Sequence, residues 1–279
     1  MGRPVKLLNR PTRTGAALLV LAALGAALAA GWWATASQSQ DLVWQRIHDR
    51  GVLTVASDLS YPPFSALDEN GSLFGFDVDL AEALGQRWGV RVEFENIAYD
   101  ALLNAVISQR DDVVISAYVP RPEYAREASF SVPYFVAGTV AVVRRGAGLE
   151  LAGDPERWAE GKTFAVEYGA AGDALARRWK RRVAGVSVLP QATAAEAMQV
   201  VENNQADAAL VDAVSAFEFL QAHAGLGLAG PPLEPETYAI VVSARSNVLL
   251  RELNLALAAM EADGTLVDLR VKWFGEAAR

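Results

Sequence analysis

The chain has 279 residues, of which 52% are hydrophobic and 21% are charged, and its formal net charge is -8. This composition is typical of a globular protein that can bury a sizeable core, and it excludes a disordered or fibrous chain. The sequence contains no cysteine, which excludes disulfides, thiolate zinc sites, a cysteine nucleophile and a lipid-anchored cysteine.

The first 36 residues have the pattern of an export signal. Four basic residues precede an uninterrupted apolar run from Gly15 to Gly31, and small residues suited to cleavage end at Ala36. The run is at the short limit for crossing a bilayer, and Trp32 and Trp33 suit an interface, so the alternative is an uncleaved anchor. We predict an exported protein, periplasmic or on the outer face of the cytoplasmic membrane, with residues 1–36 as a signal peptide or N-terminal membrane anchor and 37–45 as a linker.

Removal of residues 1–36 takes away four positive charges and changes the net charge from -8 to -12. Such an acidic body is a poor partner for nucleic acid, which requires a basic face against its phosphates. We find no metal-ligand cluster and no phosphate-binding glycine loop in the sequence. We therefore expect a monomer with no nucleic-acid partner, no metal and no cofactor.

Strands and helices alternate from residue 51 onward. GVLTVASD (51–58) and RVEFENI (91–97) are rich in strand-forming residues, and the helical repeat of Phe76, Leu80, Leu84 and Trp88 lies between them. Acidic residues occupy the first turns of that helix, where the helix dipole favours negative charge. The sequence then predicts a helix over 99–110 and a buried strand over 112–116.

The alternation resumes after residue 140 and ends in two helices. The predicted strands are 163–167, 185–189, 207–212 and 238–244, and the predicted helices are 171–182, 193–204, 213–222, 249–264 and 265–275. This order indicates mostly parallel sheets flanked by helices. FVAGTV (135–140) and GPPLEPET (230–237) are the candidate domain joints, because a glycine or three prolines interrupt regular structure there. Two joints imply a second lobe that the chain enters and leaves, with a cleft between the lobes.

Seven segments in order resemble the family 3 bacterial extracellular solute-binding proteins, which are receptors of ABC importers for amino acids and related polar solutes. They include GFDVDLA, YDALLNAV, ISAYVPRPEYARE, ADAALVDAVSA and the closing KWFG. The resemblance implies a two-lobed periplasmic-binding-protein fold of type II, with residues 46–136 and 239–279 in the first lobe and 139–235 in the second. It also implies that lobe closure buries a small ligand and presents a surface to a membrane permease.

The resemblance supplies candidate ligand contacts. Asp212 ends the apolar strand 207–212, where the family pairs a carboxylate with a ligand ammonium and where open sheets bind ligands. Tyr61 falls where the family stacks an aromatic ring on the ligand, and Tyr99 matches the opposing ring. The alternatives are loop packing for Tyr61, core packing for Tyr99, and a turn-capping role for Asp58 instead of a ligand contact.

The carboxylate side of the family's site is altered in this chain. The family typically reads Ser-Gly-x-Thr-x-Thr-Pro-Glu-Arg at the exit of the third strand, with the arginine on the ligand carboxylate. Here the matching positions are Ser116, Ala117, Val119, Arg121 and, in place of the arginine, Tyr124. Arg121 precedes a proline and is therefore biased to an extended conformation, and its fork suits a carboxylate, so it is either a substitute anion partner or a rim arginine paired with Glu123.

A second contact to the carboxylate is also altered. Where the family often has a hydroxyl-bearing residue, the turn YGAAGD has Ala170 and Ala171, which leaves only backbone N–H groups for an anion. The ligand is therefore an amino acid if Arg121 substitutes, or a cationic amine if nothing does. We assign no catalytic residue, and to ligand binding we assign Asp58, Tyr61, Tyr99, Ser116, Ala117, Val119, Arg121, Tyr124, Ala170, Ala171 and Asp212.

The alternative function is an extracytoplasmic dehydratase on the same fold. That chemistry requires a protonatable group and anion clamps in the cleft. The two histidines, His48 and His223, are not placed on predicted cleft loops. We therefore expect a binding protein and not an enzyme.

Overall fold

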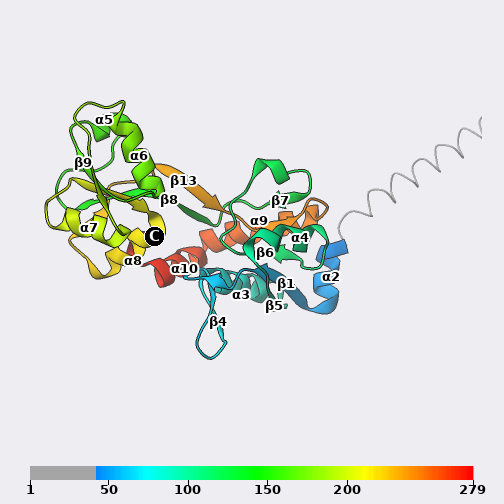
Figure 1. The fold of residues 1–279 in the computed structure, drawn as a ribbon. Coiled ribbons are helices and arrows are strands. Elements are labelled where there is room, and N and C mark those ends of the chain that lie inside the picture. Colours follow the sequence, from blue (N-terminus) through cyan, green and yellow to red (C-terminus); the bar gives the residue numbers. More distant parts are fainter. Residues whose placement is uncertain (1–41, 279) are drawn as a thin grey trace, which may run out of the picture. The chain divides into compact units, whose positions relative to one another are not determined.

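The computed structural model describes residues 42–278, which form an α/β fold with two main sheets and a small third one (Figure 1). The predicted signal peptide or anchor, residues 1–36, lies outside the described residues, as do residues 37–41 of the predicted linker. Within residues 42–278, no helix has the length and hydropathy needed to cross a membrane.

The helix α2 (Leu42–Arg50) begins inside the range 37–45 that the sequence predicted as a linker. Its buried residues Val43 and Ile47 are one turn apart, a repeat too short to identify from the sequence. Asp112 holds the other side of the helix: its Oδ1 accepts from Arg46 at 2.8 Å and its Oδ2 from Arg50 at 2.7 Å. Tertiary contacts therefore fix this helix.

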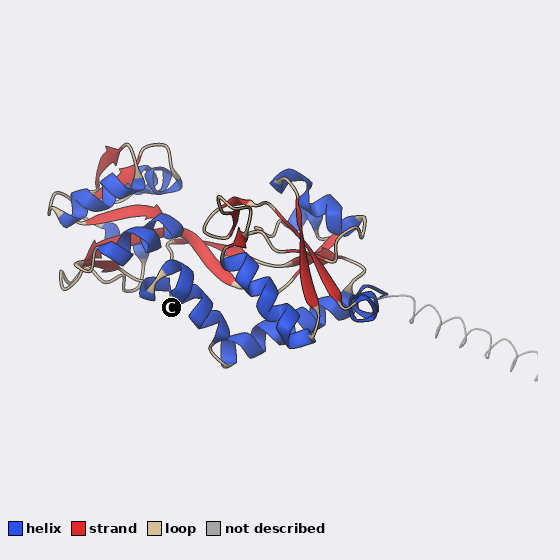
Figure 2. Ribbon diagram, turned by 90° about the horizontal axis from the view of Figure 1, so that it is seen from below, coloured by secondary structure: helices blue, strands red, loops and turns tan. Residues whose placement is uncertain are grey.

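The first sheet has the strand order β5-β1-β6-β14-β7. Its strands are β5 (Arg91–Asn96), β1 (Val52–Ser57), β6 (Val113–Val114), β14 (Val241–Ser243) and β7 (Ala128–Phe130). Alternate residues face opposite sides, so Val113 packs with α3 (Phe76–Trp88) and α9 (Asn247–Ala262), whereas Val114 packs with α4 (Leu102–Ile107). Helices lie on both faces of the sheet (Figure 2).

The second sheet has the order β10-β9-β11-β8-β12, and β13 pairs with β8. Its strands are β10 (Ser187–Gln191), β9 (Thr163–Glu167), β11 (Ala208–Asp212), β8 (Phe135–Arg144), β12 (Leu226–Leu228) and β13 (Glu234–Tyr238). Its helices are α5 (Pro155–Ala159), α6 (Ala171–Lys180), α7 (Ala194–Glu202) and α8 (Ala213–Ala222). Leu210 packs on one face with α6, and Val211 packs on the other with α7 and α8.

Short elements complete the fold. They are β2 (Ser60–Tyr61), β3 (Ser65–Leu67) and β4 (Leu73–Phe74), which form the small sheet, the 3-10 helices η1 (Tyr99–Ala101), η2 (Pro122–Tyr124) and η3 (Glu276–Ala278), and the helix α10 (Thr265–Phe274). The predicted helix 99–110 is therefore η1 followed by α4, and it ends at Ile107.

The fold class is confirmed, but the sheets are more mixed than the alternation predicted. β1 is parallel to β5 and β6, whereas β14 is antiparallel to β6 and β7, and β8 is antiparallel to β11, β12 and β13. The predicted strand 238–244 is divided, because Tyr238 pairs with β8 in the second sheet and Val241 pairs in the first. β8 carries the chain from the first sheet to the second and β13 carries it back, so these two strands run in opposite directions.

The two predicted joints pair with each other. β8 and β13 lie side by side, with Phe135 opposite Tyr238 and Thr139 opposite Glu234 (Figure 1). Gly138 lies in this pairing with a φ of 102°, and a Cβ there would lie 2.0 Å from the carbonyl oxygen of Glu234. Glycine therefore permits both the backbone conformation and the close approach of β13.

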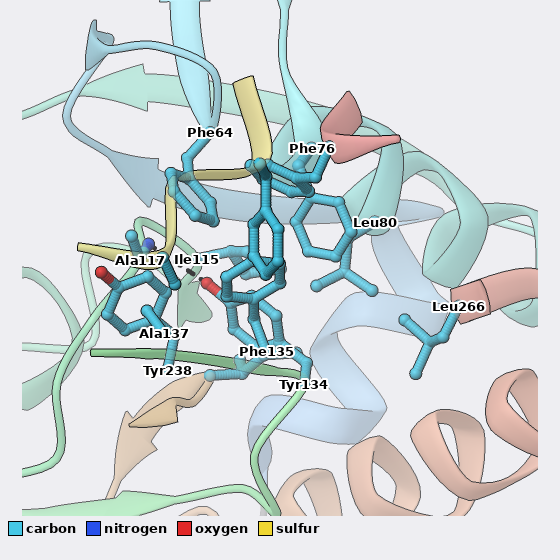
Figure 3. Packing of buried hydrophobic residues seen from close by; sticks show 14 of the residues in the cluster. Phe64, Phe76, Leu80, Ile115, Ala117, Tyr134, Phe135, Ala137, Tyr238 and Leu266 are labelled. Atoms are coloured by element: carbon cyan, nitrogen blue, oxygen red, sulfur yellow. Dashed lines mark hydrogen bonds between the residues drawn. The ribbon is translucent and has the colours of Figure 1, made fainter. Parts of the chain in front are cut away.

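Phe135 and Tyr238, which lie opposite each other in these paired strands, belong to a cluster of aromatic side chains. Phe64 lies with its ring centroid 5.2 Å from Phe135, 5.3 Å from Tyr238 and 5.2 Å from Phe274. Figure 3 shows Phe64, Phe135 and Tyr238 together with Phe76 and Tyr134. Edge and tilted contacts of this kind stabilise the pairing beyond the area they bury.

We expect Gly138→Ala to lower the free energy of unfolding by about 1–3 kcal/mol, because alanine at this φ is strained and its Cβ meets a backbone oxygen. Gly146→Ala is the matched control: Gly146 also has a positive φ, 74°, but a Cβ added there would have no neighbouring atom within 4 Å. Urea unfolding of both variants measures the difference. Equal losses would show that the close approach of β13 does not matter.

Candidate ligand-binding site

Two adjoining cavities contain most of the predicted site residues. The first, of about 640 Å³, includes Asp212, Thr139 and Ala171, and the second, of about 330 Å³, includes Asp58, Tyr99 and Ser116. Both are lined by Tyr61, Val119, Glu236 and Tyr238. Their volumes are in the range of small-molecule sites. Another cavity, of about 520 Å³ beside α9 and α10, contains none of the predicted residues.

Asp58 follows β1 and organises the loop that carries Tyr61. Its Oδ1 accepts from the backbone N and the Oγ of Ser60 at 3.1 and 2.6 Å, and its Oδ2 accepts from the backbone N of Tyr99 at 3.1 Å. Its own backbone N donates to Ser116 Oγ at 3.0 Å. Asp58 therefore caps local turns, as one of the two alternatives predicted, while its carboxylate also lines the second cavity.

Two exposed tyrosine rings line the cavities, each backed by another ring. Tyr61 stacks on Phe64 at 5.6 Å and is 47% exposed, and Tyr99 stacks on Tyr118 at 5.5 Å and is 38% exposed. Burial raises the pKa of Tyr61, and a hydrogen bond between its hydroxyl and that of Tyr238 opposes this. Burial also raises the pKa of Tyr238. Both hydroxyls therefore stay protonated at neutral pH, and because Tyr238 donates to Tyr61, only the hydroxyl of Tyr61 keeps a free O–H donor.

Asp212 ends β11 and begins α8. Its Oδ1 accepts from the backbone N of Ser215 at 2.8 Å and caps the helix, and the residue is exposed in the first cavity. Asp207, at the other end of the strand, accepts from the backbone N of Thr163 at 2.7 Å and lies outside both cavities. Asp212, at the carboxyl end of β11, therefore presents its carboxylate to the cavity, whereas Asp207, at the amino end, ties β11 to β9.

A buried carboxylate, that of Asp77, holds the backbone where the chain leaves β6. The sequence indicated this residue only as one of the acids in the first turns of a helix. Ala117 has a φ of 43°, and its N–H is shared between Asp77 Oδ2 at 2.6 Å and the hydroxyl oxygen of Tyr134 at 3.1 Å. Burial raises the pKa of Asp77 to about 7, although hydrogen bonds from Ala117 and Tyr134 lower it. Within the described residues Asp77 Oδ1 is buried and has no hydrogen-bond partner.

Three predicted residues line neither cavity: Arg121, Tyr124 and Ala170. Arg121 is exposed in the position before η2 with a φ of -119°, the extended conformation predicted from Pro122. Within residues 42–278 it forms no ion pair, so the pairing with Glu123, one of the two alternatives for this residue, is absent. Ser116, Ala117, Val119 and Ala171 do line the cavities.

Glu236, Tyr238 and Thr139 line the cavities and were not predicted as site residues. They lie on the paired strands β8 and β13. The three prolines of 230–237 identified this segment only as a joint. The alternation of Glu234, Glu236 and Tyr238, which an extended strand places on one face, was the signal that could have revealed the two residues of β13.

The charges around the cavities have one sign. Acidic side chains line them at Asp58, Asp212, Glu234 and Glu236, whereas none of the described lining residues is lysine, arginine or histidine. Glu234 forms an ion pair with Arg178 of α6. The arrangement attracts a positively charged ligand and repels an anion. Nowhere in residues 42–278 do three or more potential ligand side chains gather in a way suited to a metal ion.

Comparison with known proteins identifies the family of this chain. The family described as bacterial extracellular solute-binding proteins, family 3, matches residues 53–276. The L-cystine-binding protein TcyJ of Escherichia coli strain K12 is 29% identical over 260 residues, which cover 92% of this chain and 94% of that protein. The chain therefore belongs to the family 3 extracellular solute-binding proteins.

Two solved structures of ancestral proteins are also similar. An ancestral cationic amino acid solute-binding protein is 30% identical with a TM-score of 0.62, and the match covers 82% of this chain and 98% of that one. An ancestral cyclohexadienyl dehydratase is 25% identical with a TM-score of 0.70, and the match covers 84% of this chain and 96% of that one. The fold is therefore shared by binding proteins and an enzyme, so fold alone does not decide between them.

The raised pKa of Asp77 predicts a pH-dependent stability. From about pH 4 to about pH 7 the unfolded chain releases this proton while the folded chain keeps it, so stability falls as pH rises and levels off above pH 7. From pH 5 to pH 8 the loss due to Asp77 is on the order of 3 kcal/mol.

Urea unfolding at the two pH values checks this, with Asp77→Asn as the test and Asp49→Asn, an exposed change on α2, as the control. Asp77→Asn should remove most of the difference between pH 5 and pH 8, and Asp49→Asn should leave it. An unchanged pH profile in Asp77→Asn would exclude Asp77 as its origin.

Proposed function

We propose that this chain is the solute-binding receptor of an ABC importer and that it captures a small, amine-bearing polar solute, an amino acid or a related cationic amine. The observation that carries the proposal is the first cavity, which is lined both by the carboxylate of Asp212, from the second sheet, and by the ring of Tyr61, from the small third sheet. An ammonium group pairs with such a carboxylate, and a cation or polar stem lies well on such a ring.

Closure would occur about the paired strands β8 and β13. We propose residues 46–136 with 239–279 as one lobe and 139–235 as the other, so that the chain passes from one to the other only through these strands. The support is that Asp58 and Tyr99 follow strands of the first sheet, whereas Asp212 and Ala171 belong to elements of the second. A ligand that contacts both groups binds the closed form better and shifts the equilibrium toward it.

Export follows from the family, and a membrane permease is the partner that such a receptor would need. We propose a periplasmic location, or the outer face of the membrane, with residues 1–36 cleaved or retained as an anchor. The closed lobes would present a surface that the open ones lack, so ligand capture and permease docking would be one equilibrium.

Catalysis is the alternative, and the similarity to an ancestral dehydratase is the observation that raises it. A prephenate-like acid requires cationic clamps for its carboxylates and a group that exchanges a proton. Among the described residues, the two cavities offer no cationic side chain; His48 packs against Trp44 at 4.4 Å, and His223 contacts Glu202 outside them. We therefore propose binding without turnover.

We expect Asp212→Asn to abolish most of the ligand-induced thermal stabilisation, because the amide keeps the helix cap but removes the charge that pairs with the ligand. A thermal-shift screen of amino acids, polyamines and quaternary amines identifies the ligand first. At 100 times its dissociation constant the ligand adds about 2.7 kcal/mol to the wild type.

The matched control is Asp154→Asn, which changes the cap of α5 outside the two cavities in the same way. It should retain the full stabilisation. Retention of the same stabilisation in Asp212→Asn would remove this residue from the site.

A further inference from the structure

The floor of the ligand site carries a carboxylate with no assigned role, Glu236 on β13. It is exposed in both cavities. Within the described residues its side chain has neither a hydrogen bond nor an ion pair, whereas the neighbouring Glu234 is paired with Arg178 and Asp58 is held by backbone N–H groups. Glu236 is thus a cavity carboxylate whose charge the protein leaves uncompensated.

Strand register places Glu236 on the same face of the second sheet as Asp212. Asp212 lies opposite Thr139 of β8, and Thr139 lies opposite Glu234 of β13, two residues before Glu236. Residues directly opposite in paired strands share a face, as do residues two apart along a strand. With strands about 4.8 Å apart, the Cα atoms of Asp212 and Glu236 are roughly 12 Å apart.

No cationic side chain lines the cavities to meet the carboxylate end of an amino-acid ligand, and the first turn of α6 at Ala171 offers it only backbone N–H groups. Arg121 and Tyr124 line neither cavity, and the residues that line them add only Val119, Pro120 and other uncharged groups to the four acids. A ligand carboxylate placed between Glu236 and Asp212 would meet repulsion from both. A second positive group would instead pair with the free carboxylate.

We infer that Glu236 is a specificity-determining residue of this site, and that with Asp212 it selects solutes that carry two positively charged groups and no carboxylate. The inference rests on the proposed receptor function and narrows its ligand class to dicationic amines. Asp212 binds one cationic group and Glu236 the other, while Tyr61 and Tyr99 line the wall beside the connecting chain.

Matched pairs of ligands test the inference by isothermal titration calorimetry on the full chain. Agmatine differs from arginine, and cadaverine from lysine, only by the missing carboxylate. We expect each decarboxylated member to bind about tenfold or more tightly than its amino acid, because the missing carboxylate removes the repulsion from the acidic lining of the cavities.

Glu236→Gln should reduce that preference to about threefold or less, while Glu236→Asp should keep most of it, because only the charge is essential. The control Glu69→Gln changes an exposed acid in the turn between β3 and β4 and should leave the preference unchanged. Since the Glu236 side chain has no partner to lose within the described residues, both variants are expected to fold, which circular dichroism verifies.

Four results overturn the inference. Arginine or lysine binding as tightly as its decarboxylated form shows that the site accepts a carboxylate, and the receptor function then stands. An Arg121→Ala variant that loses arginine far more than agmatine identifies Arg121 as the anion partner. If none of these four compounds binds while another amino acid does, the preference for dicationic amines is rejected and the receptor function stands. If no amine and no amino acid binds, the receptor function is rejected as well.

Discussion

The pairing of β8 with β13 is the contact on which the rest of the site depends. It brings together residues 135–139 and 234–238, about a hundred positions apart in the chain, and of these 137–139 and 234–238 line the two cavities. Gly138 allows β13 to approach β8 closely, and the aromatic cluster around Phe64 and Phe135 packs against the paired strands. A continuous core runs from the first sheet to the second through these rings. The strands that connect the two sheets therefore also carry side chains that line the cavities.

Much of the site could be predicted because its geometry follows from short-range rules. Asp58 and Asp212 each follow a buried strand, and the ends of such strands face the crevice of an open sheet, so their place in the cavities follows from the sequence pattern. The fold class followed from alternating strands and helices. The mixed direction of the sheets did not, because it depends on which distant segment returns beside β8 and β6.

Other features depend on contacts that no local pattern contains. Asp77 reads as an acid in the first turn of a helix, yet it is buried against Ala117, forty residues later in the chain, and Tyr134. The helix α2 depends on the ion pairs of Arg46 and Arg50 with Asp112. Glu236 lies in a proline-rich segment that predicts only an interruption of regular structure. In each case a long-range contact gives the residue its environment, and the sequence contains no record of that contact.

Under the proposed function, the site keeps one half of the family's chemistry and changes the other. The proposal assigns carboxylates and tyrosines to a cationic group, while Tyr124, at the position where the resemblance implies an arginine, lies outside both cavities. A crystal structure of the complex with agmatine tests this account most directly. The account predicts one cationic group about 3 Å from a carboxylate oxygen of Asp212 and the other at a similar distance from Glu236. Agmatine bound elsewhere, or an arginine complex with its carboxylate on Arg121, would contradict it.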